Sequence, residues 1–346
     1  LFLFITMILA GDIGGTNTLL ALFEYGEKRL RLVAEDGFAS SDYDSLDEII
    51  RIFLEIDSGK VSGACFGVPG PVQNGNAELP NLPWIVECRS LREVLGNNHV
   101  WLINDLEANA YGLNELTDVD FFVLNQGEAN PDGNAAIISA GTGLGEAGIH
   151  NREGRLIPFA TEGGHADFAP RNEFEIELLR YLLEKFEKVS FERVVSGQGL
   201  VNIYEFLRDT NKAHEPEWLA LEIANQNDPA AVISNNALAG KSKICEQTLD
   251  IFISLYGAEA GNLALKMLAT NGVYVGGGIA PKVLPAFKTN AFVESFTNKG
   301  RMSSLLEKIP IRIVLNDKAA LLGAAHYARY KLTDERPTFS STASHA

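Results

Sequence analysis

The chain has 346 residues, of which 46% are hydrophobic and 21% charged, and its formal net charge is -16. We expect neither nucleic acid nor an anionic membrane as its partner, because binding to either needs clustered Lys and Arg. The length exceeds the roughly 250 to 300 residues at which one core stops growing, so two domains are expected. Three widely spaced cysteines indicate neither a disulfide framework nor a structural zinc site, and we expect a cytoplasmic location.

The first motif, LAGDIGGTN, is a glycine turn between two apolar runs, which predict a pair of strands. Gly14 and Gly15 permit positive φ, so that backbone N–H groups can close on an anion, and Thr16 and Asn17 add side-chain donors. Asp12 places a carboxylate just before the turn. We interpret the turn as a phosphate cradle; the alternative is a plain hairpin turn that binds nothing.

The elements that follow are marked by caps and turn residues. A capping box, S-x-x-E, predicts a helix over residues 45–59, and an apolar run ending in Pro-Gly-Pro predicts a strand over 61–72. The long segment 73–84 is interpreted as a binding loop. A second capping box predicts a helix over 90–96, and HVWLI predicts a strand over 99–103.

Asn104 and Asp105 follow that strand directly and precede a helical pattern. The carboxyl end of a strand is where an α/β sheet usually presents catalytic groups. Asp105 also suits the N-cap of the helix. The two roles compete, because a carboxylate that accepts capping N–H bonds has a lowered pKa and is a poor base.

Residues 135–149 repeat the opening pattern: a strand, a turn containing Gly141, Thr142 and Gly143, and a second strand. Two such units indicate a duplicated βββαβα architecture with a nucleotide held between the halves. The alternative is a pair of unrelated glycine turns.

The rest of the chain reads mainly as scaffold. The apolar pattern predicts a capped amphipathic helix over 172–186 and a long helical region over 241–269, with two glycines where another helix can approach closely. We expect a strand over 311–315, a helix over 317–330 and a disordered tail over 333–346.

Six motifs together resemble the bacterial glucokinase family of the actin-like ATPase fold: LAGDIGGTN, LINDLEANAYGL, SAGTGLGEA, TEGGHADFAP, ERVVSGQGLVNIY and YVGGGIAP. The resemblance implies a two-domain, ribonuclease H-like α/β fold with duplicated mixed sheets flanked by helices and an active site in the interdomain cleft. The small domain would comprise 1–114 and 317–332, and the large domain 115–316. GVPGPV and NLPW are also similar to the ROK sugar kinases, whose cysteine-rich zinc motif is missing here.

The resemblance implies a kinase that transfers phosphate from ATP to the 6-hydroxyl of glucose, with Mg²⁺ as cofactor. The first loop and the second, Gly141 to Gly145, would hold the phosphates, and Asp12 would position Mg²⁺ through water. The turn at Gly276, Gly277 and Gly278 would pack against the adenosine. We also expect a homodimer.

By the same resemblance, Asp105 is the general base, and the sugar site comprises Asn104, Asp105, Glu162, His165 and Glu192. Carboxylates, an amide and an imidazole suit sugar hydroxyls, which both donate and accept hydrogen bonds. Several alternatives stay open. His165 suits a buried histidine bonded to a carbonyl, and Glu192 suits the first turn of a helix. Glu162 suits a solvated loop acid, and the Glu162–His165 pair suits a metal site.

Two positions depart from the family pattern. Leu19 stands where many bacterial glucokinases have Arg, and Gln198 stands where the family usually has Pro. The alternatives to a glucokinase are therefore a kinase for another hexose and a non-catalytic sugar sensor of the same fold. The second would require damage to Asp105 or to a phosphate loop, and neither is damaged.

Overall fold

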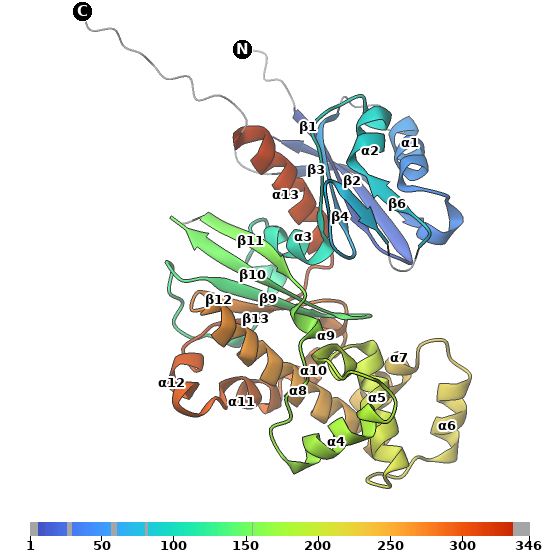
Figure 1. The fold of residues 1–346 in the computed structure, drawn as a ribbon, viewed down its shortest axis with the longest axis vertical. Coiled ribbons are helices and arrows are strands. Elements are labelled where there is room, and N and C mark those ends of the chain that lie inside the picture. The colour runs from blue at the N-terminus through green and yellow to red at the C-terminus, as the bar shows by residue number, and fades with distance from the viewer. Residues whose placement is uncertain (1–5, 26–29, 57–60, 80–81, 154, 335–346) are drawn as a thin grey trace, which may run out of the picture. The chain divides into compact units, whose positions relative to one another are not determined.

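The structure is a computed structural model that describes residues 6–25, 30–56, 61–79, 82–153 and 155–334. The chain divides into two compact units. Unit 1 comprises residues 1–116 and 318–346, and unit 2 comprises residues 117–317. Each unit is built on one main sheet with helices packed against it (Figure 1).

Unit 1 contains a five-stranded sheet of order β3-β2-β1-β4-β7. The first three strands are antiparallel neighbours, and β4 and β7 run parallel to β1. The strands are β1 (Thr6–Ile13), β2 (Asn17–Tyr25), β3 (Leu30–Ala39), β4 (Val61–Val68) and β7 (Val100–Asn104). Both strands of the first motif are confirmed. The pattern did not indicate β3, because most of its side chains are exposed or only partly buried.

Helices cover both faces of this sheet, because successive strand residues point to opposite sides. Ile8 and Ala10 pack with α3 and α13, whereas Leu9 and Ile13 pack with α1 and α2. The helices are α1 (Leu46–Ile56), α2 (Cys88–Leu95), α3 (Asp105–Gly112) and α13 (Ala319–Asp334). The alternating apolar residues of β1 are therefore all buried, and unit 1 has three layers.

Three expectations in unit 1 need correction. α2 begins before Ser90, whose hydroxyl donates to Asp47 instead of capping a helix. The segment 73–84, interpreted as a loop, contains β5 (Asn76–Glu78), which pairs with β6 (Ile85–Glu87). α13 runs to Asp334, so the tail expected to be disordered is helical at its start, and its remainder lies outside the described residues.

Unit 2 contains a six-stranded sheet of order β11-β10-β9-β12-β13-β8. Its first five strands repeat the directions of the unit 1 sheet, with two antiparallel pairs followed by two parallel pairs, and β8 is added antiparallel at the edge. The strands are β8 (Phe121–Asn125), β9 (Ala135–Ala140), β10 (Leu144–Arg152), β11 (Arg155–Thr161), β12 (Gly272–Gly276) and β13 (Ile311–Val314). The predicted duplication is confirmed, and both glycine turns occupy the same place in it, β1–β2 and β9–β10.

The core of unit 2 forms around α8, which packs on β9, α5, α7 and α11 (Figure 1). A Cβ at Gly257 would overlap the Phe292 carbonyl oxygen, and one at Gly261 would lie 2.5 Å from that of Phe296, so the two glycines permit the close approach of α11. The helices are α4 (Glu173–Leu183), α5 (Gly197–Asp209), α6 (Glu217–Ala224), α7 (Pro229–Leu238), α8 (Lys243–Met267), α9 (Ile279–Lys282), α10 (Leu284–Phe287), α11 (Ala291–Thr297) and α12 (Ser303–Leu306).

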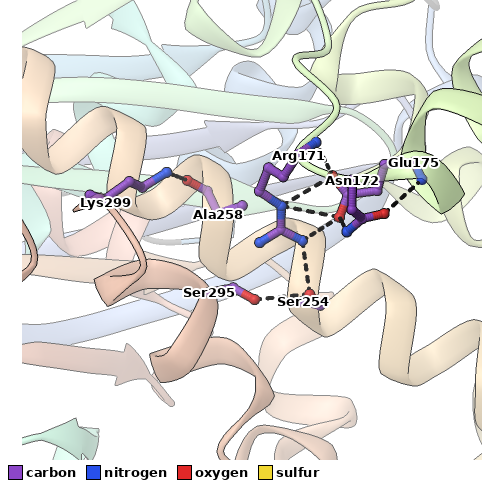
Figure 2. Close-up of polar contacts among 7 residues, drawn as sticks. All are labelled: Arg171, Asn172, Glu175, Ser254, Ala258, Ser295 and Lys299. Carbon is purple, nitrogen blue, oxygen red and sulfur yellow. Dashed lines mark hydrogen bonds and ion pairs between the residues drawn. The ribbon is translucent and has the colours of Figure 1, made fainter.

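A polar cluster ties the start of α4 to α8 and α11 (Figure 2). Arg171 forms a largely buried ion pair with Glu175, 2.5 Å between Nη2 and Oε1, and donates to Ser254 Oγ at 2.9 Å. Ser254 in turn bonds Ser295 at 2.9 Å. Burial, followed by the charge of Arg171, lowers the pKa of the nearby Lys299 to about 8. The cluster fixes the segment that connects β11 to α4.

None of the helices within the described ranges combines the length and the apolar character that crossing a membrane requires.

Candidate active site

The first glycine turn joins β1 to β2 and is held by backbone bonds. Gly14 N donates to Asn17 O at 2.9 Å, and a Cβ at Gly14 would lie only 2.7 Å from that oxygen. Ser40, which the sequence analysis missed, donates through Oγ to Gly14 O at 2.8 Å. The backbone at Gly14 and Gly15, both described residues, does not adopt positive φ. The reason expected for these glycines is therefore wrong; Gly14 is required by a close backbone approach.

Asp12 lies at the end of β1, beside the turn. Burial and, second, the charge of Asp105 raise its pKa from 3.8 to about 6. The two carboxylates therefore share one electrostatic environment at the carboxyl ends of parallel strands. Oxygen ligands of this kind suit Mg²⁺, which keeps several waters and is bound by one or two carboxylates together with substrate phosphates. The donor set fits the implied cation.

Asn104, not Asp105, is the N-cap of α3. Its Oδ1 accepts from Leu106 N at 2.9 Å and from Glu107 N at 3.3 Å, and its Nδ2 donates to Gly70 O at 3.2 Å. Asp105 is the first residue of the helix, with Oδ1 2.8 Å from Leu106 N. The two expected roles are thus divided between neighbouring residues: Asn104 builds the helix end, and Asp105 stands beside Asp12.

The second glycine turn and Glu192 form one local structure in unit 2. Gly141 N donates to Gly143 O at 2.8 Å, and Leu144 N donates to Glu192 Oε2 at 3.1 Å. A Cβ at Gly143 would lie 2.5 Å from that same oxygen. Glu192 lies in the first turn of a short 3-10 helix (Phe191–Arg193), so the alternative that places it in the first turn of a helix is confirmed. A residue implied for the sugar and a turn implied for phosphate are thus in contact.

A second 3-10 turn (Gly163–His165) gathers the remaining polar residues. His165 Nε2 lies 3.9 Å from Glu162 Oε2, and His165 Nδ1 lies 3.9 Å from Glu192 Oε1. The side chains of His165 and Glu162 are 62% and 67% exposed, which contradicts a buried histidine and leaves both free of tight packing. In the part of the chain that the structure describes, no three His, Cys, Asp or Glu side chains are grouped to hold a metal.

The third glycine turn follows β12 and packs on the end of β9. Gly277 has φ 82°, and a Cβ there would overlap the Ala140 carbonyl oxygen. Gly276 approaches Ser139 Oγ, 2.5 Å from the position of a Cβ. Gly278 precedes α9 as its N-cap residue. This turn therefore packs against Ala140, the residue just before the second glycine turn. Both glycine turns lie at the carboxyl ends of two adjacent parallel strands, β9 and β12.

Comparison with known proteins now gives the family. The family model described as Glucokinase matches residues 9–331. A glucokinase of Nostoc punctiforme is 44% identical over 334 residues, which are 92% of this chain and 98% of that protein. The crystal structure of a glucokinase from an Antarctic psychrotroph is similar with a TM-score of 0.82 at 31% identity, covering 94% of this chain and 99% of that one.

A more distant solved structure shows the same fold. It is a ROK family glucokinase from Streptomyces griseus in complex with glucose and AMPPNP, with a TM-score of 0.64 at 21% identity, covering 94% of this chain and 99% of that one. The fold is that of the actin-like ATPases, with mixed sheets flanked by helices. The family match, the identity over nearly the whole length and the fold agree: the chain belongs to the glucokinase family.

Proposed function

We propose that the protein transfers the γ-phosphoryl group of ATP to the 6-hydroxyl of glucose. The observation that carries the proposal is the placement of Asp105 directly after β7, where its charge acts on Asp12 and where Asn104 is the N-cap of α3. Membership in the glucokinase family supports glucose as the acceptor and ATP as the donor. Units 1 and 2 would then be the small and the large domain of the family.

The residues of unit 1 supply the charge chemistry. Asp105 accepts the proton of the 6-hydroxyl as its oxygen attacks phosphorus. Asp12 would hold Mg²⁺ through water, and the cation would supply positive charge for the phosphoryl group when bound. The first glycine turn adds N–H groups and the hydroxyl of Thr16 toward the phosphates. Most of the rate then comes from positioning and from preorganised dipoles.

The residues of unit 2 select the sugar and hold the rest of the nucleotide. Glu162, His165 and Glu192 bind hydroxyls, each side chain accepting or donating to a separate group. The turn at Gly141–Gly143 faces phosphate, and the turn at Gly276–Gly278 packs on the adenosine. A sugar that lacks a paired hydroxyl leaves a polar group of the site unbonded, at a cost of about 1 to 3 kcal/mol.

The test is a coupled assay of ADP release with Mg-ATP and, in turn, glucose, mannose, fructose, N-acetylglucosamine or no sugar. Strong turnover selective for glucose supports the proposal. Selective turnover of another sugar would show a different hexose kinase. No sugar-dependent turnover, with glucose still raising the melting temperature, would instead show a sugar sensor.

We also propose a cytoplasmic, glycolytic role and a homodimer. Cys65, Cys88 and Cys245 are free and buried, as suits a reducing compartment, and burial raises the pKa of each thiol. Light scattering behind a sizing column measures the assembly directly; a mass of 37.6 kDa would show a monomer and contradict the dimer.

A further inference from the structure

A buried carboxyl that the proposed chemistry does not use lies directly beneath the turn that carries Glu162 and His165. Glu146 of β10 is 1% exposed, and a Cβ at Gly163 would overlap its Oε2 atom. Thr161 Oγ1 donates to Glu146 O at 2.8 Å and accepts from Gly163 N at 3.2 Å. The turn therefore rests on this residue through both its side chain and its backbone.

A second buried carboxyl, Glu259 of α8, faces Glu146. Glu259 is fully buried, and each of its oxygens has a donor: Lys266 Nζ lies 3.1 Å from Oε1, and Asn262 Nδ2 lies 2.7 Å from Oε2. Glu146 Oε1, by contrast, has no hydrogen-bond partner among the described residues. A buried oxygen without a partner is rare and costly, and one proton held between the two carboxyls supplies the missing bond.

The proton belongs to Glu146. Lys266 and Asn262 contact Glu259 directly, whereas Glu146 forms no ion pair with any described residue and is affected by Lys266 only through its charge. Burial first, and then the charge of Glu259 and a hydrogen bond to it, raise the pKa of Glu146 to about 8. At pH 7 Glu146 is therefore mainly uncharged.

We propose that Glu146 is a positioning residue whose uncharged carboxyl, hydrogen-bonded to Glu259, holds the Glu162–His165 turn in the shape that binds sugar. When Glu146 loses its proton, two carboxylates repel each other in a dry interior directly under Gly163. The turn then shifts, and sugar affinity falls on the alkaline side. The inference rests on the proposed function, because it concerns the sugar that the turn binds.

The titratable groups that interact with Glu146 come from α8: Glu259, Lys266 and Tyr256. The turn that rests on Glu146 carries Glu162 and His165, whose side chains are largely exposed. Among these groups of α8, Lys266 reaches solvent, with a side chain that is 49% exposed. Its charge lowers the pKa of Glu146, so its removal must move the ionisation of Glu146 to higher pH.

The experiment measures kcat and the KM values for glucose and ATP from pH 6.5 to 9.5 in the wild type, Glu146→Gln, Lys266→Met and a surface control, Glu294→Gln. We expect the wild-type KM for glucose to rise about tenfold from pH 7 to pH 9, with the KM for ATP nearly constant. Gln keeps the size and a donor toward Glu259, so the KM of Glu146→Gln for glucose stays flat across this range. Glu294→Gln follows the wild type.

If Glu146→Gln does not fold, Lys266→Met still decides, because it is expected to move the rise in KM to higher pH. The inference is overturned if the KM of the wild type for glucose does not rise with pH. It is also overturned if the rise is the same in Glu146→Gln and occurs at the same pH in Lys266→Met. Either result leaves the proposed function standing. The absence of glucose-dependent ADP release in the wild type overturns the proposed function and this inference with it.

Discussion

The polar residues of unit 1 and those of unit 2 are held in different ways. Asp12 and Asn104 lie at the ends of two parallel strands, β1 and β7, with β4 between them, and Asp105 directly follows Asn104. Their positions follow from backbone hydrogen bonds. Glu162, His165 and Glu192 lie on two short 3-10 turns and meet at 3.9 Å. In the first group, burial and the charge of Asp105 raise the pKa of Asp12, whereas in the second group Glu162 and His165 are largely exposed and Glu192 is partly buried.

The difference teaches where each task is placed. Groups that must hold charge near reacting atoms need a fixed position partly shielded from water, which the carboxyl ends of the strands provide. Groups that recognise hydroxyls can close on the sugar when it arrives, at the cost of ordering them. We therefore expect substitutions in unit 1 to change mainly kcat or stability, and substitutions in unit 2 to change mainly the KM for glucose.

Asp105→Asn tests the comparison with the largest effect. The amide keeps the contact to Leu106 N but accepts no proton, so kcat is expected to fall by about 10² to 10⁴. Glucose binding measured by calorimetry should change by less than about threefold. Asp44→Asn, an exposed site in the same unit, is the control. Near-normal turnover would rule out Asp105 as the base.

Glu192→Ala tests the expectation that substitutions in unit 2 change mainly the KM for glucose. The substitution removes an acceptor of the Leu144 N–H group and a partner of His165. The KM for glucose is expected to rise by about 10 to 100-fold, because one or two hydrogen bonds to the bound sugar are lost. The value of kcat is expected to fall by much less. Glu187→Ala, exposed and nearby, should leave both constants unchanged. An equal loss in kcat and kcat/KM would contradict the division between the units.

Asp12→Asn tests whether the buried charge of Asp12 destabilises the folded protein. The folded pKa, about 6, lies above the ordinary 3.8, so the stability tied to this proton is present below pH 3.8 and lost as the pH rises through 6. At pH 7.5 the amide should therefore raise the free energy of unfolding by about 2 kcal/mol while activity is lost. Urea unfolding at pH 7.5 and at pH 4 measures this, and the gain should largely vanish at pH 4. Asp132→Asn is the exposed control; a less stable Asp12→Asn would refute this destabilisation.

Glu162→Gln is expected to have the smallest effect on stability, within about 0.5 kcal/mol, because the side chain is 67% exposed. The same urea titration measures it. A loss of more than about 1 kcal/mol in the free energy of unfolding would show that the unit 2 turns are held as tightly as the strand ends of unit 1.

Local patterns predicted the strands on both sides of the first two glycine turns and the residues at the ends of these strands, but not β3 or β5. LAGDIGGTN and LIND contain their own strand and turn signals, so Asp12 and Asp105 could be singled out from sequence. The contacts of Ser40 with Gly14 and of Glu146 with Gly163 join residues 26 and 17 positions apart and leave no periodic signal. Residue types likewise did not say whether Asn104 or Asp105 caps α3. The sugar residues of unit 2 were found through family resemblance alone.

The helix α13 gives the chain a fixed order of completion during synthesis. A ribosome makes every residue of unit 2 before Ala319, yet α13 supplies the apolar residues that cover Ile8, Ala10 and Ala108 in unit 1. Close contact of Gly323 with the Ala108 carbonyl oxygen makes that fit specific. A nascent chain therefore holds an open apolar sheet face until α13 emerges. Premature termination between Asp317 and Ala319 thus damages unit 1, although most of unit 1 is made before unit 2.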